Sequence, residues 1–254
     1  MPFQEGEYVY LVDQNGNKHW MRISYGMMKI SSLGTLDGSR FKEMDDGSQF
    51  SVANRKFTVF RPTAAELMGS LERGAQVIIP KDAASIIFNC GIRSGTKVLE
   101  IGAGSGGLTT ALLSAVAPEG CVHTLELSEE NAIRAQKNVK RTGLDRHWTY
   151  QIGDARTTDI DFTADAMTID MPGPEDALDN LFPHLRAGGK IAVYVPNTNQ
   201  LEAAVEKLRE LDFCDVFAIE IIQREMVVHA GGVRPSYDML GHTGYLAYGR
   251  KRAR

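Results

Sequence analysis

The sequence has 254 residues, a formal net charge of −4, and 43% hydrophobic and 24% charged residues. This length is enough for one large α/β domain with a small appendage, and the composition is that of an ordinary globular protein. No apolar run approaches the ~20 residues that cross a bilayer, and the N-terminus lacks the basic and then apolar segments of a signal peptide, so we expect neither feature.

The net charge and the cysteines narrow the function classes further. Binding to nucleic acid through phosphates needs Lys and Arg, so a net charge of −4 does not by itself indicate an RNA-binding protein. The three cysteines, Cys90, Cys121 and Cys214, are odd in number and have no C-x-x-C spacing. This pattern argues against a disulfide framework and a metal site, and it favours a cytoplasmic protein whose cysteines pack in the interior.

The first 62 residues contain several short strand patterns. The first two alternate between apolar and polar residues and flank Asn15-Gly16, a pair that is typical of a tight hairpin turn. The predicted strands are Tyr8–Val12, His19–Ile23, Ser48–Ala53 and Phe57–Phe60. We therefore predict a small N-terminal β-rich domain, either a barrel or a sandwich, over residues 1–62.

A second domain, residues 63–254, alternates helices with apolar strands. Thr63 and Glu66 have the spacing of a capping box and predict a short helix that ends at Leu71. The predicted helices after it are Asp82–Cys90, Gly107–Val116, Glu129–Arg141, Glu175–Leu185 and Asn199–Leu211. The predicted strands are Lys97–Ile101, Cys121–Leu125, Trp148–Ile152, Ala164–Ile169, Lys190–Val195, Val216–Val228 and Thr243–Arg250. Such alternation predicts an α/β fold with a parallel sheet that helices cover on both faces. The last two strands have no helical pattern between them, so we expect them to pair antiparallel.

The strongest local motif is the glycine-rich loop VLEIGAGSGG at residues 98–107. Glycines after a strand permit a tight turn and bring a ligand close to the backbone N–H groups at the start of a helix. Read as Gly102, Gly104 and Gly107, the loop also satisfies the G-x-G-x-x-G pattern of dinucleotide-binding enzymes. The loop therefore indicates a nucleotide or nucleoside ligand without choosing between them.

Of the carboxylates at successive strand ends, Glu100 and Asp154 make that choice, whereas dinucleotide enzymes share the carboxylate at Glu126, which indicates a nucleoside without choosing between cofactors. Glu100 lies two residues before Gly102, where it can bind an amino group of the ligand or hold the loop, whereas a pyrophosphate gains nothing from this negative charge. Glu126 ends the next strand, where it can accept both hydroxyls of a ribose. Asp154 and Ala155 follow the third strand. The E-x-G-x-G-x-G string resembles motif I of the class I methyltransferases, and that resemblance implies S-adenosylmethionine as cofactor, with Asp154 at its adenine amino group.

Three further segments are more specific than the fold. QVIIPKD occupies residues 76–82, DMPGP follows the fourth strand at residues 170–174, and RP at residues 234–235 precedes GHTGYL at residues 241–246. In this order they resemble the tRNA (adenine-58-N1)-methyltransferase family, and the resemblance covers residues 73–251. It implies a class I methyltransferase (Rossmann-like) sheet with a terminal antiparallel hairpin, preceded by the small β-domain.

The family resemblance also implies an activity and a set of site residues. The activity is transfer of a methyl group from S-adenosylmethionine to N1 of the adenine at position 58, or at positions 57 and 58, in the tRNA T loop, by a cytoplasmic homotetramer. Asp170 is the catalytic candidate because it can accept a hydrogen bond from the exocyclic amine of the adenine. The alternative interpretation is that it caps the following helix. The implied cofactor-binding residues are Gln76, Glu100, Gly102, Gly104, Ser105, Gly106, Gly107, Glu126, Asp154, Ala155 and Asp170.

Contacts to the substrate are harder to assign. Lys81 is a candidate for a phosphate contact or a solvated lysine, and Arg234 for a contact to a phosphate or to a neighbouring subunit. His242 is a candidate for a substrate contact or for a histidine that fixes the final hairpin. The family normally has an aromatic residue near Pro80 or directly after Pro174, where this sequence has Ile79 and Glu175. We therefore expect another residue to hold the target base.

Three other interpretations remain at this point. A class I methyltransferase for a small molecule, such as a corrin-ring precursor, agrees with the acidic charge but leaves GHTGYL and the N-terminal β-domain unexplained. A non-catalytic RNA-binding subunit has no need of the glycines and acidic residues that this sequence keeps. An NAD(P)-dependent reductase lacks a recognisable hydride-transfer constellation such as Tyr-x-x-x-Lys.

Overall fold

The computed structural model describes residues 1–30, 34–71 and 78–253. The chain divides into two compact units. The first unit comprises Met1–Ser70 with Lys140–Gly143, and the second comprises Leu71–Val139 with Leu144–Arg254. The domain boundary between residues 62 and 63 stays a prediction.

The first unit is built from short antiparallel strands. Four of them form a sheet in the order β2-β1-β6-β5, and β3 pairs with β4. The strands are β1 (Tyr8–Asp13), β2 (Lys18–Arg22), β3 (Met27–Ile30), β4 (Gly34–Asp37), β5 (Gln49–Val52) and β6 (Arg55–Phe60). A 3₁₀ helix, η1 (Gly38–Glu43), and helix α1 (Ala64–Ser70) complete the unit. Its core is apolar and rich in aromatic rings, with Phe3, Leu11, Phe41 and Phe57 almost fully buried.

Two local predictions for this unit are confirmed by hydrogen bonds. The Asn15-Gly16 turn joins β1 to β2, and the Asp13 carboxylate accepts from the backbone N–H groups of Asn15 and Asn17. At the start of α1, the Thr63 N–H donates to the Glu66 carboxylate while the Glu66 N–H donates to Thr63 Oγ1. These are the two reciprocal bonds of a capping box.

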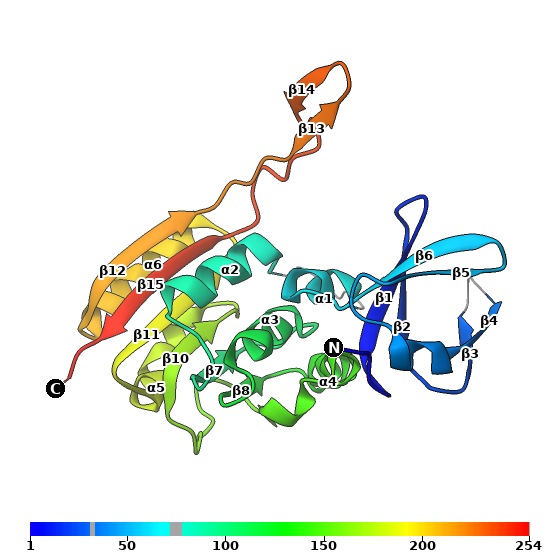
Figure 1. The fold of residues 1–254 in the computed structure, drawn as a ribbon. Coiled ribbons are helices and arrows are strands. Elements are labelled where there is room, and N and C mark those ends of the chain that lie inside the picture. The colour runs from blue at the N-terminus through cyan, green and yellow to red at the C-terminus, as the bar shows by residue number, and fades with distance from the viewer. Residues whose placement is uncertain (31–33, 72–77, 254) are drawn as a thin grey trace. The chain divides into compact units, whose positions relative to one another are not determined.

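The second unit contains a seven-stranded sheet in the order β12-β15-β11-β10-β7-β8-β9 (Figure 1). The strands from β7 to β11 pair in parallel, and β15 runs antiparallel to both of its neighbours. Their bounds are β7 (Lys97–Ile101), β8 (Cys121–Glu126), β9 (Trp148–Ile152), β10 (Ala164–Ile169), β11 (Leu185–Val195), β12 (Phe213–Glu220) and β15 (Tyr245–Lys251). This is the predicted α/β sheet with antiparallel pairing at its end.

Helices cover both faces of this sheet (Figure 1). They are α2 (Pro80–Asn89), α3 (Gly107–Val116), α4 (Glu129–Thr142), α5 (Leu178–Leu181) and α6 (Thr198–Glu210), with 3₁₀ turns η2 (Asp145–His147), η3 (Pro174–Asp176) and η4 (Phe182–His184). The core under α5 and α6 includes Leu99, Met167, Leu181, Val193 and Leu208, each at most 1% exposed. Such side chains contribute roughly 1.5–3 kcal/mol each when they leave water, so this apolar layer keeps the sheet rigid beneath the loops at its edge.

Two sequence predictions were wrong in their extent. The predicted helix Glu175–Leu185 is broken into η3, one turn of α5 and η4. Pro183 lies in the last of these, and a proline inside a helix removes a backbone donor and crowds the preceding turn. The predicted strand Val216–Val228 is also divided, because β12 ends at Glu220 and the rest belongs to a separate hairpin. That hairpin consists of β13 (Met226–His229) and β14 (Gly232–Pro235).

A buried polar network ties the start of α2 to the loop before β15. The ammonium group of Lys81 lies 2.7 Å from Asp82 Oδ1 and donates to Thr243 Oγ1, while Thr243 Oγ1 donates to Asp82 Oδ2 at 2.9 Å. The side chain of Lys81 is 8% exposed and that of Asp82 is fully buried. The network therefore joins the PKD segment to the GHTGYL segment, and each charge depends on the other for its compensation.

Within the described ranges, no helix combines the length and the apolar character needed to pass through a bilayer.

Replacing Asp82 with alanine tests the network. Asp82→Ala leaves the buried Lys81 ammonium without its carboxylate, so we expect the free energy of unfolding to fall by about 3–5 kcal/mol. The control is Glu130→Ala, which removes an exposed i,i+4 partner of Arg134 and should change stability by about 0.5 kcal/mol at most. Urea unfolding of both variants measures the difference, and equal effects would show that the buried network does not stabilise the fold.

Candidate active site

The glycine-rich loop follows β7 and leads into α3. Gly102 has φ +88°, and a Cβ atom added to it would lie 2.1 Å from the carbonyl oxygen of Asp170 at the end of β10. The Asp170 N–H donates to the Ile101 carbonyl at 2.9 Å, which holds the two strand ends together. Only glycine fits this close approach at this φ. Gly104, by contrast, faces open space, because an added Cβ there meets nothing within 4 Å.

Glu126, at the end of β8, holds the loop through backbone N–H groups. Its Oε2 accepts from Ala103 N at 2.7 Å and from Gly104 N at 3.1 Å, and its Oε1 accepts from Ser128 N at 2.8 Å. Further along the loop, the Asn138 side chain donates to the Ser105 carbonyl. The carboxylate is thus fixed beside the loop, and its contact to ribose hydroxyls stays a prediction.

Glu100 is fully buried within β7. Its Oε2 accepts from the hydroxyls of Thr109 on α3 and Thr124 on β8, and its Oε1 is buried without a hydrogen-bond partner among the described residues. Burial, together with repulsion from Asp170 and Glu126, raises the pKa of Glu100 to about 7. Of the two roles left open by the sequence, these contacts favour holding the loop.

Asp170 lies directly after β10 and lines a cavity of about 160 Å³. Burial, and then the negative charge of Glu126, raise the pKa of Asp170 to about 7. A carboxylate at the carboxyl edge of a parallel sheet, in a cavity, is placed where ligands of open α/β folds bind. The residues that line the cavity are Ile78, Asp170, Met171, Pro172, Tyr194, Pro196 and Gln200.

Two residues of this cavity were missed by the sequence analysis. Tyr194 lies near the carboxyl end of β11, where its hydroxyl donates to the Thr243 carbonyl at 2.5 Å. A Cβ atom added to Gly244 would lie 2.3 Å from the ring of Tyr194, so the glycine in GHTG makes room for this ring. Gln200, in the first turn of α6, has a buried Oε1 with no hydrogen-bond partner among the described residues. An aromatic residue at the end of the fifth predicted strand was the available signal for Tyr194.

The remaining predicted cofactor residues are placed as follows. Asp154 Oδ1 accepts from the backbone and the guanidinium of Arg156, and Ala155 is buried in the core. Gly106 and Gly107 form the junction between the loop and α3. Gln76 lies outside the described residues. The contacts of these residues to a cofactor stay predictions.

Two of the three predicted substrate contacts are engaged in hydrogen bonds within the fold. Lys81 donates to Asp82 and Thr243, which favours a structural role. His242 lies 2.7 Å from Glu220 Oε1 through Nδ1 and 2.9 Å from the Pro196 carbonyl through Nε2. Because both partners accept, both ring nitrogens donate, and the Glu220 and Pro196 contacts raise the pKa of His242. His242 is therefore held as a brace for the final loop, and its contact to substrate stays a prediction.

Arg234, the third, lies on β14, where its guanidinium lies 4.3 Å from the centre of the Tyr237 ring. Its contact to a phosphate or a subunit stays a prediction.

The chemistry of the site fits a cationic nucleoside. Glu100, Glu126 and Asp170 end three neighbouring strands beside the loop, and repulsion from the other two carboxylates adds to burial in raising the pKa of Glu100. A ligand with positive charge relieves this repulsion, and S-adenosylmethionine carries a sulfonium and an ammonium group. The open space at Gly104 leaves the loop free to approach such a ligand. Within the part of the chain that the structure describes, no group of three or more His, Cys, Asp or Glu side chains is arranged to hold a metal ion.

Comparison with known proteins identifies the family. The family described as the tRNA methyltransferase complex GCD14 subunit matches residues 57–233. The tRNA (adenine(57)-N(1)/adenine(58)-N(1))-methyltransferase TrmI of Methanocaldococcus jannaschii is 32% identical over an alignment of 270 positions that covers 96% of this chain and 94% of that protein.

Two solved structures share the whole fold. The tRNA (m1A58) methyltransferase TrmI from Aquifex aeolicus has a TM-score of 0.78 and 26% identity, with all of both chains covered. A structure described as a SAM-dependent O-methyltransferase from Thermotoga maritima has a TM-score of 0.84 and 25% identity, covering 100% of this chain and 96% of that one. The glycine loop, the carboxylates beside it and these matches together place the chain in the family of S-adenosylmethionine-dependent class I methyltransferases that modify N1 of adenine in tRNA.

Proposed function

We propose that this protein transfers a methyl group from S-adenosylmethionine to N1 of adenine 58 in the T loop of tRNA, in the cytoplasm. The observation that carries the proposal is the cavity where Asp170 lies beside Tyr194, at the carboxyl edge of the same sheet that presents the glycine loop. The relatives from M. jannaschii and A. aeolicus are named for this reaction. The M. jannaschii name also includes adenine 57, and methylation at that position here is a second part of the proposal.

The mechanism needs orientation more than proton transfer. S-adenosylmethionine supplies an electrophilic methyl group when it is bound. N1 of adenine carries a lone pair in the plane of the ring, so no base has to remove a proton before the attack. As N1 gains the methyl group, positive charge develops on the base, and the ionised Asp170 stabilises it by accepting a hydrogen bond from the exocyclic amine.

Other residues of the cavity complete the site. Tyr194 lines the cavity together with Asp170, and its ring is our candidate to hold the base. The positions where the family normally has an aromatic residue are Ile79 and Glu175 in this chain. Gln200 also lines this cavity, and its Oε1 is buried with no hydrogen-bond partner among the described residues. An adenine in the T loop has to leave its stack to reach such a cavity, and the cost of a few kcal/mol is offset by these contacts.

Asp170 is tested by substitution. Asp170→Asn removes the negative charge and Asp170→Ala removes the group, so we expect kcat to fall by about 10²–10³-fold, more steeply for alanine. Binding of S-adenosylmethionine, measured by calorimetry, should stay within about threefold, because the loop is held by Glu126 and not by the Asp170 side chain.

The matched control is Asp161→Asn, the same change at an exposed loop carboxylate. It should leave kcat and tRNA binding at the level of the natural chain. Unchanged turnover in both Asp170 variants would remove Asp170 from the mechanism.

The pH dependence of the reaction follows from the same group. Asp170 acts as the carboxylate, and its raised pKa of about 7 means that protonation removes the acceptor as the pH falls below neutrality. We expect kcat/KM for S-adenosylmethionine, which reports the enzyme before the cofactor binds, to rise between pH 6 and pH 8 (roughly one unit on each side of this pKa). The rising limb should be much weaker in Asp170→Asn, and an identical limb in that variant would assign it to another group.

The oligomeric part of the proposal is a homotetramer, and the β13–β14 hairpin supports it. Met226 and Val228 lie on one face of the hairpin opposite Pro235 and Val233, and the side chains of Val228 and Val233 are 72% and 63% exposed. The hairpin stands out from the sheet of its own unit (Figure 1). A two-stranded hairpin with a bare apolar face is marginal in water, so a second copy of the chain that covers this face stabilises both.

Light scattering after size exclusion tests the assembly. We expect a mass of four times the 28.0 kDa of one chain. Val228→Lys with Val233→Lys should lower this mass, because charges then have to be buried at the interface. Ile133→Lys, the same type of change at an exposed site on α4, is the control. A single-chain mass for the natural protein would contradict the proposal.

A further inference from the structure

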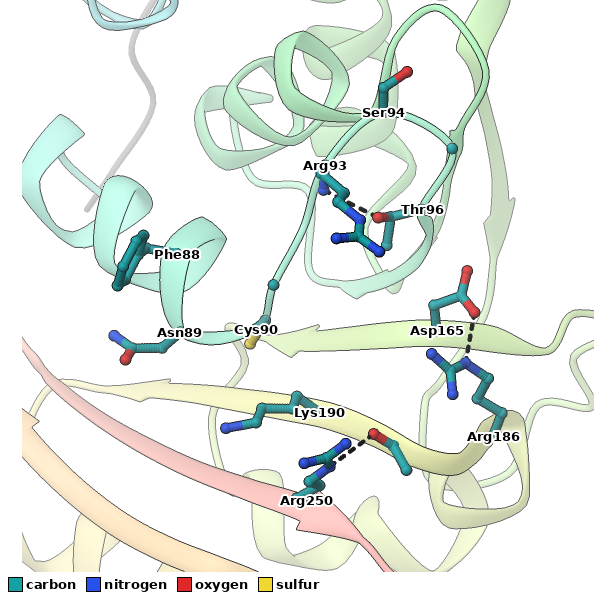
Figure 2. A pocket seen from close by; sticks show the side chains of 13 residues that line it. Phe88, Asn89, Cys90, Arg93, Ser94, Thr96, Asp165, Arg186, Lys190 and Arg250 are labelled. Carbon is teal, nitrogen blue, oxygen red and sulfur yellow. Dashed lines mark hydrogen bonds and ion pairs between the residues drawn. The ribbon is translucent and has the colours of Figure 1, made fainter.

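A second pocket, of about 460 Å³, lies away from the candidate active site. Its walls are the C-terminal end of α2, the loop before β7, the first residues of β10 and β11, and the last residues of the antiparallel strand β15 (Figure 2). All of these belong to the amino edge of the parallel strands, whereas Asp170 lies at the carboxyl edge. A strand of five or six residues separates the two edges by about 17–20 Å.

The pocket is basic, although the chain is acidic. Arg93 reaches the lining from the loop before β7, Arg186 and Lys190 from β11, and Arg250 from β15 (Figure 2). Asp165 is the one carboxylate among the lining residues that the structure describes. The lining therefore has a net charge of +3, in a chain whose formal net charge is −4. Such a concentration of one sign in a concave site focuses the electrostatic potential on a ligand of the opposite sign.

The single carboxylate does not neutralise the pocket. Asp165 Oδ1 lies 2.6 Å from Arg186 Nε, and its Oδ2 accepts from the Lys97 N–H. Although partial burial acts in the other direction, these two donors hold the pKa of Asp165 below its ordinary value. Both oxygens of Asp165 are thus already engaged, and the pair with Arg186 accounts for one cation only.

The other cations lack this compensation. Arg250 Nε donates to the Gly188 carbonyl, a neutral group, and neither Arg93 nor Lys190 has a carboxylate partner within the described ranges. Burial raises the pKa of the neighbouring Cys90 thiol to about 12. This side chain therefore stays protonated and adds no negative charge to the pocket. Guanidinium and ammonium groups that cluster without an anionic partner favour the binding of an anion from solution. Phosphate is one that Arg binds through bidentate hydrogen bonds.

An exposed aromatic ring indicates that the phosphate belongs to a nucleic acid. Phe88, at the end of α2, also lines the pocket and is 86% exposed. A bare phenyl ring beside several cations is the combination that binds RNA, because the cations contact the backbone while the ring stacks on a base. A free inorganic phosphate makes no use of the ring.

We propose that this basic pocket, with Arg93, Lys190 and Phe88 as its free contacts, binds the sugar–phosphate backbone of tRNA at a point remote from the target adenine. The inference rests on the proposed function. The pocket also gives the chain a local positive surface for RNA, although its net charge is −4. The pocket acts as an anchor: it adds affinity for the whole tRNA and takes no part in methyl transfer.

The test compares tRNA binding by the natural chain and by Arg93→Ala/Lys190→Ala. Neither side chain has a carboxylate partner to lose among the described residues, so the variant should fold with an unchanged melting temperature. We expect the Kd for unmodified tRNA to rise about tenfold and the slope of log Kd against log salt to fall by about 2, one for each phosphate contact removed. KM for tRNA should rise with it, and kcat should change far less. Phe88→Ala should weaken binding without changing the salt slope.

Two controls isolate the contribution of the pocket to tRNA binding. Arg209→Ala removes an exposed cation on α6, outside the pocket, and should leave the Kd and the salt slope at their natural values. An isolated T-arm stem-loop lacks the remote part of tRNA, so the natural chain and the double variant should methylate it with similar KM values.

Each outcome decides a different point. An unchanged Kd and salt slope for tRNA in the double variant would overturn the anchor, while methylation of tRNA by the natural chain would still support the proposed function. If tripolyphosphate binding is lost in the double variant but tRNA binding is not, the pocket serves a small phosphate compound, and the RNA anchor is wrong. If the natural chain neither binds nor methylates tRNA, the proposed function itself fails.

Discussion

The site depends on the close approach of two strand ends. Gly102 lies against the backbone of Asp170, and the Asp170 N–H bonds to Ile101, so β7 and β10 end side by side with no side chain between them. This contact places the glycine loop and the Asp170 carboxylate at one edge of the sheet. It also brings Asp170 close enough to Glu126 and Glu100 for their charges to raise pKa values. A bound cation would relieve part of this repulsion.

The two edges of the sheet carry opposite charges. Carboxylates end the parallel strands on the side of the glycine loop, whereas arginines and a lysine surround the starts of the strands and the end of β15. The acidic edge suits a sulfonium nucleoside, and the basic edge suits a phosphate backbone. The net charge of −4 is a sum over the whole chain, so it does not reveal that one edge of the sheet is acidic and the other basic. Buried networks such as Lys81–Asp82–Thr243 keep the segments of the acidic edge in register with the sheet.

Patterns of residues close together in the sequence predicted much of this arrangement. Contacts between residues far apart in the sequence could not be predicted in this way. The glycine loop, the capping box at Thr63 and the strand-end carboxylates depend on neighbours a few residues apart. The position of Tyr194 depends on the Thr243 carbonyl that it contacts and on the space beside Gly244, and both residues lie some fifty residues away in the sequence. The start of β13 was absorbed into the one long predicted strand Val216–Val228, because no Gly or Pro separates it from β12. The basic pocket draws on four separate segments, which no local pattern reveals.

The most direct measurement is transfer of the labelled methyl group of S-adenosylmethionine to unmodified tRNA, followed by nucleoside analysis and mapping of the modified position. We expect 1-methyladenosine at position 58 of the T loop, and no methylated product from tRNA that carries guanosine at that position. Binding of S-adenosylmethionine without any transfer to tRNA, or a different methylated nucleoside, would contradict the assignment of adenine N1 as the acceptor.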